Sequence, residues 1–211
     1  MGRAMKKDGS ENPFSLPEYW SGRYRRGETG WDNQRPHPYL EEVLRRHPET
    51  IRGKDVLVIG AGPGHDAELF SRSGAKRVVA LDFSEAAKKS FQKYYPDSRV
   101  EYALLDFFHP PPDLKAETVF EHTLLCAIDP ARYGDYFRSL QKVLLPGGNY
   151  LALIWNQTPA GKNGPPFSTP NRVVEEGLKG GFKILEREAV TATIPGRENT
   201  ETFFLAERLP K

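Results

Sequence analysis

The chain has 211 residues, of which 38% are hydrophobic and 27% are charged, a balance typical of one globular domain. Its 30 Lys and Arg and 28 Asp and Glu residues are interleaved and leave a net charge of +2, which argues against a protein whose main task is to bind nucleic acid. It has no apolar run long enough for a membrane span, no secretory signal at its N-terminus and one cysteine, Cys126, so we expect a cytoplasmic protein without disulfides or a cysteine-rich metal site.

Residues 1–211 are expected to form a single domain, in which residues 1–12 are mobile and an aromatic, Arg-rich stretch continues to residue 38. Helical and strand patterns then alternate. In chain order we expect a helix at 39–47, a strand at 55–60, a helix at 65–74, a strand at 77–82, a helix at 84–95, a strand at 99–104, a strand that runs into a loop at 118–128, a helix at 133–144, a strand at 149–155, a loop at 156–170, a helix at 171–178, and closing strands at 182–190 and 202–208. The alternation predicts an α/β fold with a parallel sheet, and the last two strands predict an antiparallel ending.

A glycine-rich turn follows the first of these strands and opens a helix. Gly60, Gly62 and Gly64 let the backbone turn tightly and approach a ligand, and Asp82, at the end of the next strand, can accept hydrogen bonds from ribose hydroxyls. A dinucleotide fingerprint needs its third glycine one position later, where this chain has His65. The pattern, continued by Phe83, instead resembles the S-adenosylmethionine-dependent methyltransferases of Rossmann-like fold.

The third strand is followed by a further acid and two aromatic residues. A carboxylate at Asp106 can accept from an adenine amino group, and the ring of Phe107 can cover the base. The alternative is that the rings of Phe107 and Phe108 belong to the core. Because neighbouring residues on a strand point to opposite faces, we expect one of the two to be a core residue.

An aromatic ladder near the N-terminus makes the resemblance more specific. Trp20, Tyr24 and Trp31, with a Gly-Glu-Thr-Gly turn and a later Gln-Arg-Pro, resemble the N-terminal segment of the thiopurine methyltransferase family, which includes thiol, thiocyanate and halide methyltransferases. The resemblance implies a class I Rossmann-like fold with a seven-stranded, mostly parallel sheet, an antiparallel C-terminal strand and helices on both faces. It also implies that residues 13–38 close over the cofactor S-adenosylmethionine, which the three rings contact. The alternative is that the rings only anchor this segment to the core.

Two later segments also resemble that family. In Phe120-Glu-His-Thr-Leu-Leu-Cys-Ala-Ile128, His122 takes a position that contacts cofactor in the family, although the family has Tyr or Arg there. A strand-end His bonded to backbone is the alternative. The loop Asn163-Gly-Pro-Pro-Phe167 resembles one that closes over the substrate, and otherwise it is a rigid connection. We do not expect Cys126 to act as a nucleophile, because methyl transfer from a sulfonium is direct.

The resemblance implies a small, soft acceptor: a thiol, hydrosulfide, thiocyanate, halide or aromatic thiol. Candidates to line its pocket are Phe14, Arg35, Trp155 and Phe167, of which Arg35 either attracts an anion or forms a structural ion pair. No general base or other catalytic residue is nominated, and no metal-ligand spacing is present. We expect a monomer that binds a small molecule, with neither nucleic acid nor membrane as partner. An O- or N-methyltransferase for another metabolite and a non-catalytic cofactor-binding module remain as alternatives.

Overall fold

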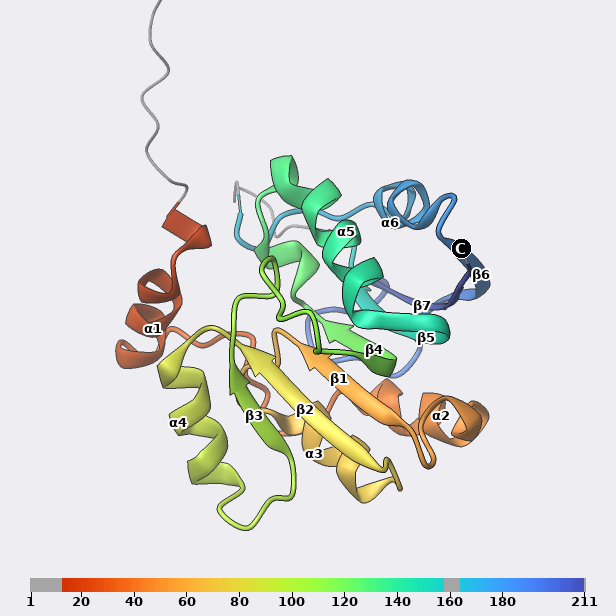
Figure 1. The fold of residues 1–211 in the computed structure, drawn as a ribbon. Coiled ribbons are helices and arrows are strands. Elements are labelled where there is room, and N and C mark those ends of the chain that lie inside the picture. The colour runs from red at the N-terminus through yellow and green to blue at the C-terminus, as the bar shows by residue number, and fades with distance from the viewer. Residues whose placement is uncertain (1–12, 158–163, 211) are drawn as a thin grey trace, which may run out of the picture.

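Seven strands form one sheet in the computed structural model of the chain, which describes residues 13–157 and 164–210 (Figure 1). The expectation for residues 1–12 lies outside these described residues. The strands are β1 (Asp55–Ile59), β2 (Arg77–Asp82), β3 (Glu101–Leu104), β4 (Ala116–His122), β5 (Leu144–Trp155), β6 (Phe182–Ala189) and β7 (Glu201–Arg208). Their order is β3-β2-β1-β4-β5-β7-β6, and β7 runs in the opposite direction to the other six described strands. The predicted fold class is confirmed.

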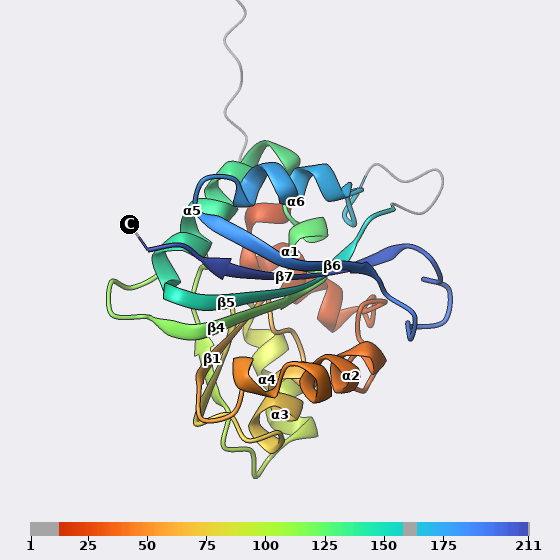
Figure 2. The same ribbon diagram turned by 90° about the vertical axis from the view of Figure 1, so that its right-hand side faces the viewer.

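Helices cover both faces of the sheet, as Figure 2 shows with the sheet seen nearly edge-on. They are α1 (Pro17–Arg25), α2 (Pro38–Arg46), α3 (His65–Arg72), α4 (Glu85–Tyr94), α5 (Tyr133–Val143) and α6 (Asn171–Leu178). Neighbouring residues of a strand serve opposite faces. Val58 packs in a core with Phe70 of α3, whereas Ile59 packs in a second core with Leu140 of α5. The β1 strand is therefore buried on both sides, which explains its unbroken apolar sequence.

The structure locates the ends of two strands that the sequence left open or placed elsewhere. Within 118–128, predicted as a strand that runs into a loop, the strand ends at His122 because Thr123 has a φ of +62°, which breaks the extended path. A short 3-10 helix, Leu125–Ala127, follows. The fifth strand starts at Leu144, directly after α5, rather than at Asn149, and its pairing with β4 shifts where Pro146 and the glycines after it loop out.

Helix α1 lies in the stretch for which the sequence predicted no element. Among its residues only Ser21 and Gly22 are buried, so it has no apolar stripe for a periodicity argument to find. Its ends do carry the expected chemistry: Pro17 occupies the first turn with Glu18, and Arg25 lies in the last turn.

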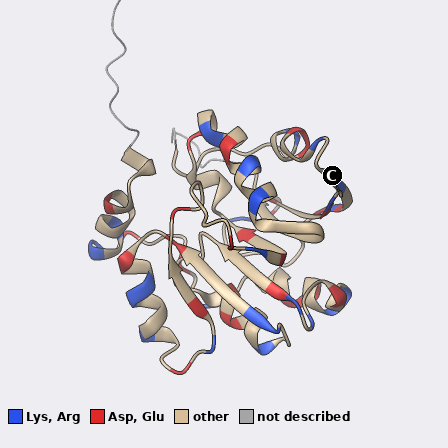
Figure 3. Ribbon diagram, in the orientation of Figure 1, with Lys and Arg blue, Asp and Glu red and all other residues tan. Residues whose placement is uncertain are grey.

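Basic and acidic residues are mixed over the ribbon in the view of Figure 3, in agreement with their interleaving in the sequence. In the part of the chain that the structure describes, every helix is too short or too polar to cross a bilayer.

Candidate functional site

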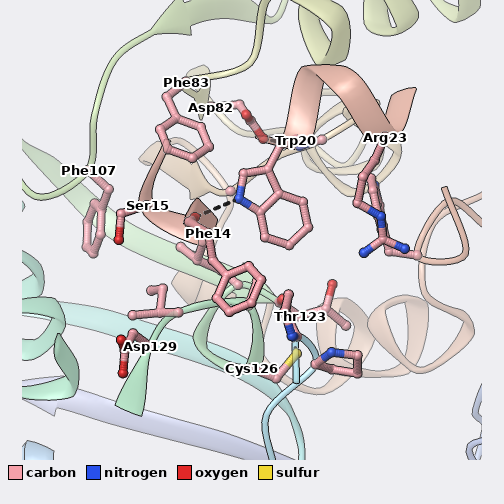
Figure 4. A pocket seen from close by; sticks show the side chains of 18 of the residues that line it. Phe14, Ser15, Trp20, Arg23, Asp82, Phe83, Phe107, Thr123, Cys126 and Asp129 are labelled. Atoms are coloured by element: carbon pink, nitrogen blue, oxygen red, sulfur yellow. Dashed lines mark hydrogen bonds between the residues drawn. The ribbon is translucent and has the colours of Figure 1, made fainter. Parts of the chain in front are cut away.

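A cavity of about 290 Å³ opens at the carboxyl ends of the central strands, beneath the N-terminal segment (Figure 4). Open α/β sheets bind ligands at this edge. The structure brings eleven of the residues singled out from sequence to its wall: Phe14, Trp20, Tyr24, Trp31, Gly60, Gly62, Asp82, Phe83, Asp106, Phe107 and Trp155. The cavity thus joins residues from the beginning, middle and later part of the chain.

Three other predicted residues lie elsewhere. Arg35 and His122 line a smaller cavity of about 40 Å³ next to the glycine loop, which shares Trp31, Gly60, Gly62 and Thr123 with the wall of the large cavity. Phe167 does not line the large cavity, but Pro165 and Pro166 beside it do, and its ring centroid lies 5.8 Å from that of Phe14. Asn163, the first residue of the proline loop motif, falls outside the described residues.

The glycine loop after β1 has a backbone conformation, and a closeness to its neighbours, that residues with side chains would not allow. Gly60 and Gly62 have φ angles of +62° and +53°, in the left-handed region. A Cβ on Gly60 would lie 2.7 Å from Leu124 Cδ1, and one on Gly62 would lie 3.3 Å from the Tyr24 hydroxyl. The Tyr102 hydroxyl donates to the carbonyl oxygen of Gly62 at 2.7 Å. The loop therefore packs closely against Leu124, in the turn after β4, and against Tyr24 of α1.

The carboxylate of Asp82 faces the cavity from the end of β2. It accepts hydrogen bonds from the backbone N–H groups of Gly62, at 3.0 Å, and Ser84, at 2.9 Å. Burial raises the pKa of Asp82, and the N–H donors only partly oppose this. The same carboxylate thus shapes the glycine loop and presents an acceptor to a ligand.

Asp106, Phe107 and Phe108, which follow β3, differ in their burial and in their contacts. Asp106 accepts from the N–H of Phe108 at 2.9 Å, and its other oxygen lies 2.7 Å from His109 Nδ1. Phe107 is only 5% exposed and packs with Tyr136 in the core beneath α5, while its edge reaches the cavity. Of the two rings, Phe107 is thus the more deeply buried, and Asp106 remains accessible.

The aromatic ladder forms the roof of the cavity. Trp31 meets Trp20 and Tyr24 edge to face, with ring centroids 5.4 and 5.5 Å apart, and its Nε1 donates to the Tyr24 hydroxyl at 3.2 Å. Trp20 Nε1 donates to the carbonyl of Phe14 at 2.9 Å, the dashed bond in Figure 4. Burial raises the pKa of Tyr24, which keeps its hydroxyl protonated. These contacts hold the segment over the cavity as one unit.

A buried carboxylate that sequence reasoning missed shapes the floor. Glu121, fully buried in β4, accepts from the N–H groups of Leu124, at 2.8 Å, and Leu125, at 3.3 Å, while its Oε1 has no hydrogen-bond partner among the described residues. Burial raises the pKa of Glu121 to about 7. It fixes the turn at which Thr123, with its positive φ, faces the cavity. An acid directly after the apolar pair Val119-Phe120 was the available signal.

Cys126 also lines the cavity, but its surroundings keep it a thiol. It is 3% exposed, its Sγ donates to the carbonyl of Thr123 at 3.2 Å, and burial raises the thiol pKa further above neutral pH. Because the thiolate is the reactive form, this geometry does not make a nucleophile.

His122 belongs to a buried network behind the glycine loop. Its Nδ1 lies 3.0 Å from Asp66, and its Nε2 lies 3.4 Å from a guanidinium nitrogen of Arg197. Arg197 also donates to Glu201 at 3.3 Å, and Glu201 lies 3.1 Å from Nε2 of His37. These side chains come from the start of α2, from α3, from β4, from the turn before β7 and from β7 itself.

The ligand atoms of His37, His122 and Glu201 lie within 4.8 Å of one another, close enough to hold a metal ion. Their hydrogen bonds point to a different role. Nδ1 of His37 accepts from the N–H of Tyr39 at 3.2 Å, so Nε2 carries the ring proton and donates to Glu201. Since the permanent cation of Arg197 contacts two of the three groups, the arrangement favours a buried ion-pair network over a metal site.

Three arginines line the large cavity, and the sequence analysis selected none of them. The guanidinium groups of Arg23, Arg132 and Arg197 lie over the rings of Trp31, Phe108 and Trp155, at 4.8, 3.7 and 4.4 Å from the ring centroids. Arg35, the cation proposed from sequence, lies at the smaller cavity instead. Arg197 reaches Trp155 only because β7 pairs with β5, a contact that no local pattern reveals.

Comparison with known proteins identifies relatives along nearly the whole chain. The sequence model for the family "Thiopurine S-methyltransferase (TPMT)" matches residues 16–210. Thiocyanate methyltransferase 1 of Brassica oleracea is 28% identical over 187 residues, which cover 86% of this chain and 81% of that protein. A thiopurine S-methyltransferase of Vibrio campbellii is 32% identical over 183 residues, which cover 79% of this chain and 83% of that protein.

Solved structures share the fold at lower sequence identity. The 1,6-didemethyltoxoflavin-N1-methyltransferase of Burkholderia thailandensis, solved with 1,6-didemethyltoxoflavin and S-adenosylhomocysteine, superposes with a TM-score of 0.72 at 18% identity. The match covers 97% of this chain and 94% of that one. This likeness concerns the fold alone.

Proposed function

The chain belongs to the thiopurine S-methyltransferase family, and from that premise we propose how its cavity is divided between methyl donor and acceptor. The family uses S-adenosylmethionine to methylate small thiol-type nucleophiles, and the thiocyanate and thiol methyltransferases among the relatives agree with this activity. The chemistry that the bound cofactor supplies is a methyl group activated on a positively charged sulfur.

The donor end of the cavity fits that cofactor. The left-handed glycines Gly60 and Gly62 leave space that a Cβ would fill, and Asp82 and Asp106 present carboxylates to accept from ribose and adenine. Aromatic side chains supply ring faces for the sulfonium and for the base. We assign to the cofactor Trp20, Tyr24, Trp31, Gly60, Gly62, Asp82, Phe83, Asp106 and Phe107.

The acceptor end is walled by Phe14, Trp155 and the two prolines of the 164–167 loop. One observation carries the assignment: the buried guanidinium of Arg197 lies 4.4 Å from the Trp155 ring centroid, at the wall of an otherwise apolar end. Arg197 is paired with Glu201, but a guanidinium has five N–H donors, so it can also donate to a small anionic nucleophile, while the rings and prolines exclude water. We therefore propose an acceptor that reacts as an anion, such as a thiolate, hydrosulfide, thiocyanate or halide.

In this proposal the protein aligns the reactants and supplies no base. A thiol with a pKa near 8.5 is partly ionised at neutral pH, and thiocyanate and halides carry no proton to remove. Proximity and orientation in a dry cavity then provide the acceleration. His122 and Arg35 line the smaller cavity beside the glycine loop, and the proposal assigns neither of them to the acceptor.

The test is turnover on a panel of acceptors with S-adenosylmethionine, read as S-adenosylhomocysteine formed. We expect turnover with hydrosulfide, methanethiol, thiocyanate, iodide or an aromatic thiol, and none with a catechol. For a thiol, kcat/KM should rise with pH through the thiol's own pKa, whereas for thiocyanate or iodide it should stay nearly flat. Turnover of the catechol alone would contradict the proposal, and a thiol profile governed by one pKa regardless of the thiol would reveal a protein base.

A further inference from the structure

Three arginines of the described residues line the large cavity, and they differ in their hydrogen-bond partners. Arg197 donates to Glu201, and Arg132 donates to Ser15 at 3.3 Å and lies 4.0 Å from Asp135. The guanidinium of Arg23 makes no hydrogen bond to any residue in the described part of the chain. Its nearest carboxylate, Glu28, is 3.8 Å away, beyond hydrogen-bonding distance.

Glu28 is already engaged. It accepts two bonds from Arg26, at 2.8 and 2.9 Å, a paired geometry that uses both carboxylate oxygens. Arg23 instead lies on aromatic faces, 4.8 Å from the Trp31 ring centroid and 6.0 Å from that of Trp20. Its side chain is 24% exposed, so a largely desolvated cation with free donors faces the cavity.

The position of Arg23 on α1 shows which part of the cavity its side chain faces. Trp20, Arg23 and Tyr24 are spaced so that they share one face of the helix. That face lies over the glycine loop, because the Tyr24 hydroxyl is 3.3 Å from where a Gly62 Cβ would stand. Figure 4 shows Arg23 on the side of Trp20 away from Phe107, while Arg197 lies over Trp155, at the end assigned to the acceptor.

The donor S-adenosylmethionine ends in an amino acid group whose carboxylate is its only anion. If Asp82 and Asp106 held the adenosine and the rings held the sulfonium, the amino acid group would extend beyond the sulfur, where Arg23 lines the same cavity. A guanidinium and a sulfonium on the same rings would repel each other unless an anion lay between them. We propose, on the basis of the function proposed above, that Arg23 binds the carboxylate of the cofactor's amino acid group.

The fork of guanidinium donors matches a carboxylate in two parallel bonds, so this contact is worth more than a point charge. Arg23 is thus a determinant of cofactor affinity that is separate from the adenosine contacts of Asp82 and Asp106.

The test measures binding by titration calorimetry with two ligands, S-adenosylhomocysteine and its decarboxylated analogue, which lacks only the carboxylate. We expect Arg23→Gln to weaken S-adenosylhomocysteine binding 10- to 100-fold and to change binding of the analogue by less than threefold. The control is Arg25→Gln, on the same helix but 60% exposed and paired with Glu18, which should leave both affinities within twofold.

The outcomes separate the two proposals. Equal weakening of both ligands by Arg23→Gln would mean that Arg23 only supports the rings, and no weakening of either would remove it from the site, so both results overturn the inference. Failure of the unaltered protein to bind S-adenosylhomocysteine would instead overturn the proposed cofactor site. Thermal unfolding of each variant without ligand shows whether the helix remains folded.

Discussion

At the scale of single residues, strained backbone and buried charge gather around the cavity. Gly60, Gly62 and the non-glycine Thr123 all have positive φ angles and all line it. Glu121 holds the turn that contains Thr123 from below. Such conformations persist only where surrounding contacts hold them, and they are frequent at ligand sites. Each of these residues can be tested by one substitution.

The first test concerns the close packing of the glycine loop. Gly60→Ala would place a methyl group 2.7 Å from Leu124 in a left-handed backbone, so the loop must shift. We expect binding of S-adenosylhomocysteine to weaken at least tenfold. The control is Gly53→Ala, with a φ of +71° but nothing within 4 Å of its Cβ. It should cost about 1 kcal/mol of stability and leave binding unchanged. Equal binding by the two variants would contradict this reading.

The second test concerns Glu121, whose pKa burial raises from 4.5 to about 7. A carboxyl with a raised folded-state pKa binds its proton more tightly in the folded protein, so its contribution to stability falls as pH rises from about 4.5 to about 7. Because glutamine does not ionise, Glu121→Gln removes this loss of stability at higher pH. We expect the variant's free energy of unfolding, relative to the unaltered protein, to increase between pH 5 and pH 8 by up to about 3 kcal/mol.

Urea unfolding at several pH values measures this difference. Glu117→Gln is the control on the same strand, since Lys54 lowers the pKa of Glu117 and its titration lies below the range examined. If the difference in free energy of unfolding between Glu121→Gln and the unaltered protein did not change with pH, the pKa of Glu121 would not be raised in the folded protein. The hydrogen bonds to its carboxylate would then offset the cost of burying the charge.

At the scale of elements, helix α1 and the start of α4 are joined by a buried contact. The hydroxyls of Ser21 and Ser84 lie 3.0 Å apart, and Ser84 also caps α4 by accepting from the N–H of Ala87. This contact holds the roof of the cavity on the helix that follows Asp82. The position of α1, and with it the aromatic ladder, thus depends on a small number of polar atoms.

Ser21→Ala removes this hydrogen bond with little change in volume. Since a buried neutral bond contributes about 1 kcal/mol, we expect binding of S-adenosylhomocysteine to weaken about fivefold. Tryptophan fluorescence is a direct readout, because the chain has 3 tryptophans and all line the cavity. Ser73→Ala, which removes a bond within α3, is the control and should not alter binding. Unchanged affinity for Ser21→Ala would show that ring packing alone holds α1.

At the scale of the whole molecule, the buried network around Arg197 joins segments from both ends of the chain. Burial opposes ionisation of Glu201, but hydrogen bonds from His37 and Thr193 lower its pKa to about 2. The stability this supplies is present above pH 4.5 and is lost as pH falls toward 2. The network therefore ties the start of α2 to β7 behind the cavity.

A double-mutant cycle of Arg197→Met and Glu201→Gln measures how strongly this pair is coupled. Either single change leaves a buried polar group without its partner and should cost about 3 kcal/mol, while the double variant should cost about 1–2 kcal/mol less than the sum. The control cycle uses Arg77 and Glu101, an exposed pair, for which the coupling should stay below about 1 kcal/mol. Equal coupling in both cycles would mean that burial adds nothing.

The sequence alone determined the order of strands and helices, the antiparallel ending, the glycine turn and the acid after the second strand. These features are local, because periodicity, turn residues and strand ends depend on residues that are close together in the sequence. Helix α1 was missed because it buries only small residues. Within 118–128, the sequence did not locate the point where the strand passes into the loop, which is set by one left-handed residue, Thr123.

Only the tertiary structure decided which charges face the cavity. Arg23 and Arg197 are ordinary residues in their own segments, and they line the cavity because α1 folds over the glycine loop and β7 pairs with β5. Arg35 and His122, chosen from their positions in the sequence, lie at the smaller cavity. Side-chain contacts between distant segments depend on how elements pack, and that packing is a property of the whole chain rather than of any local pattern.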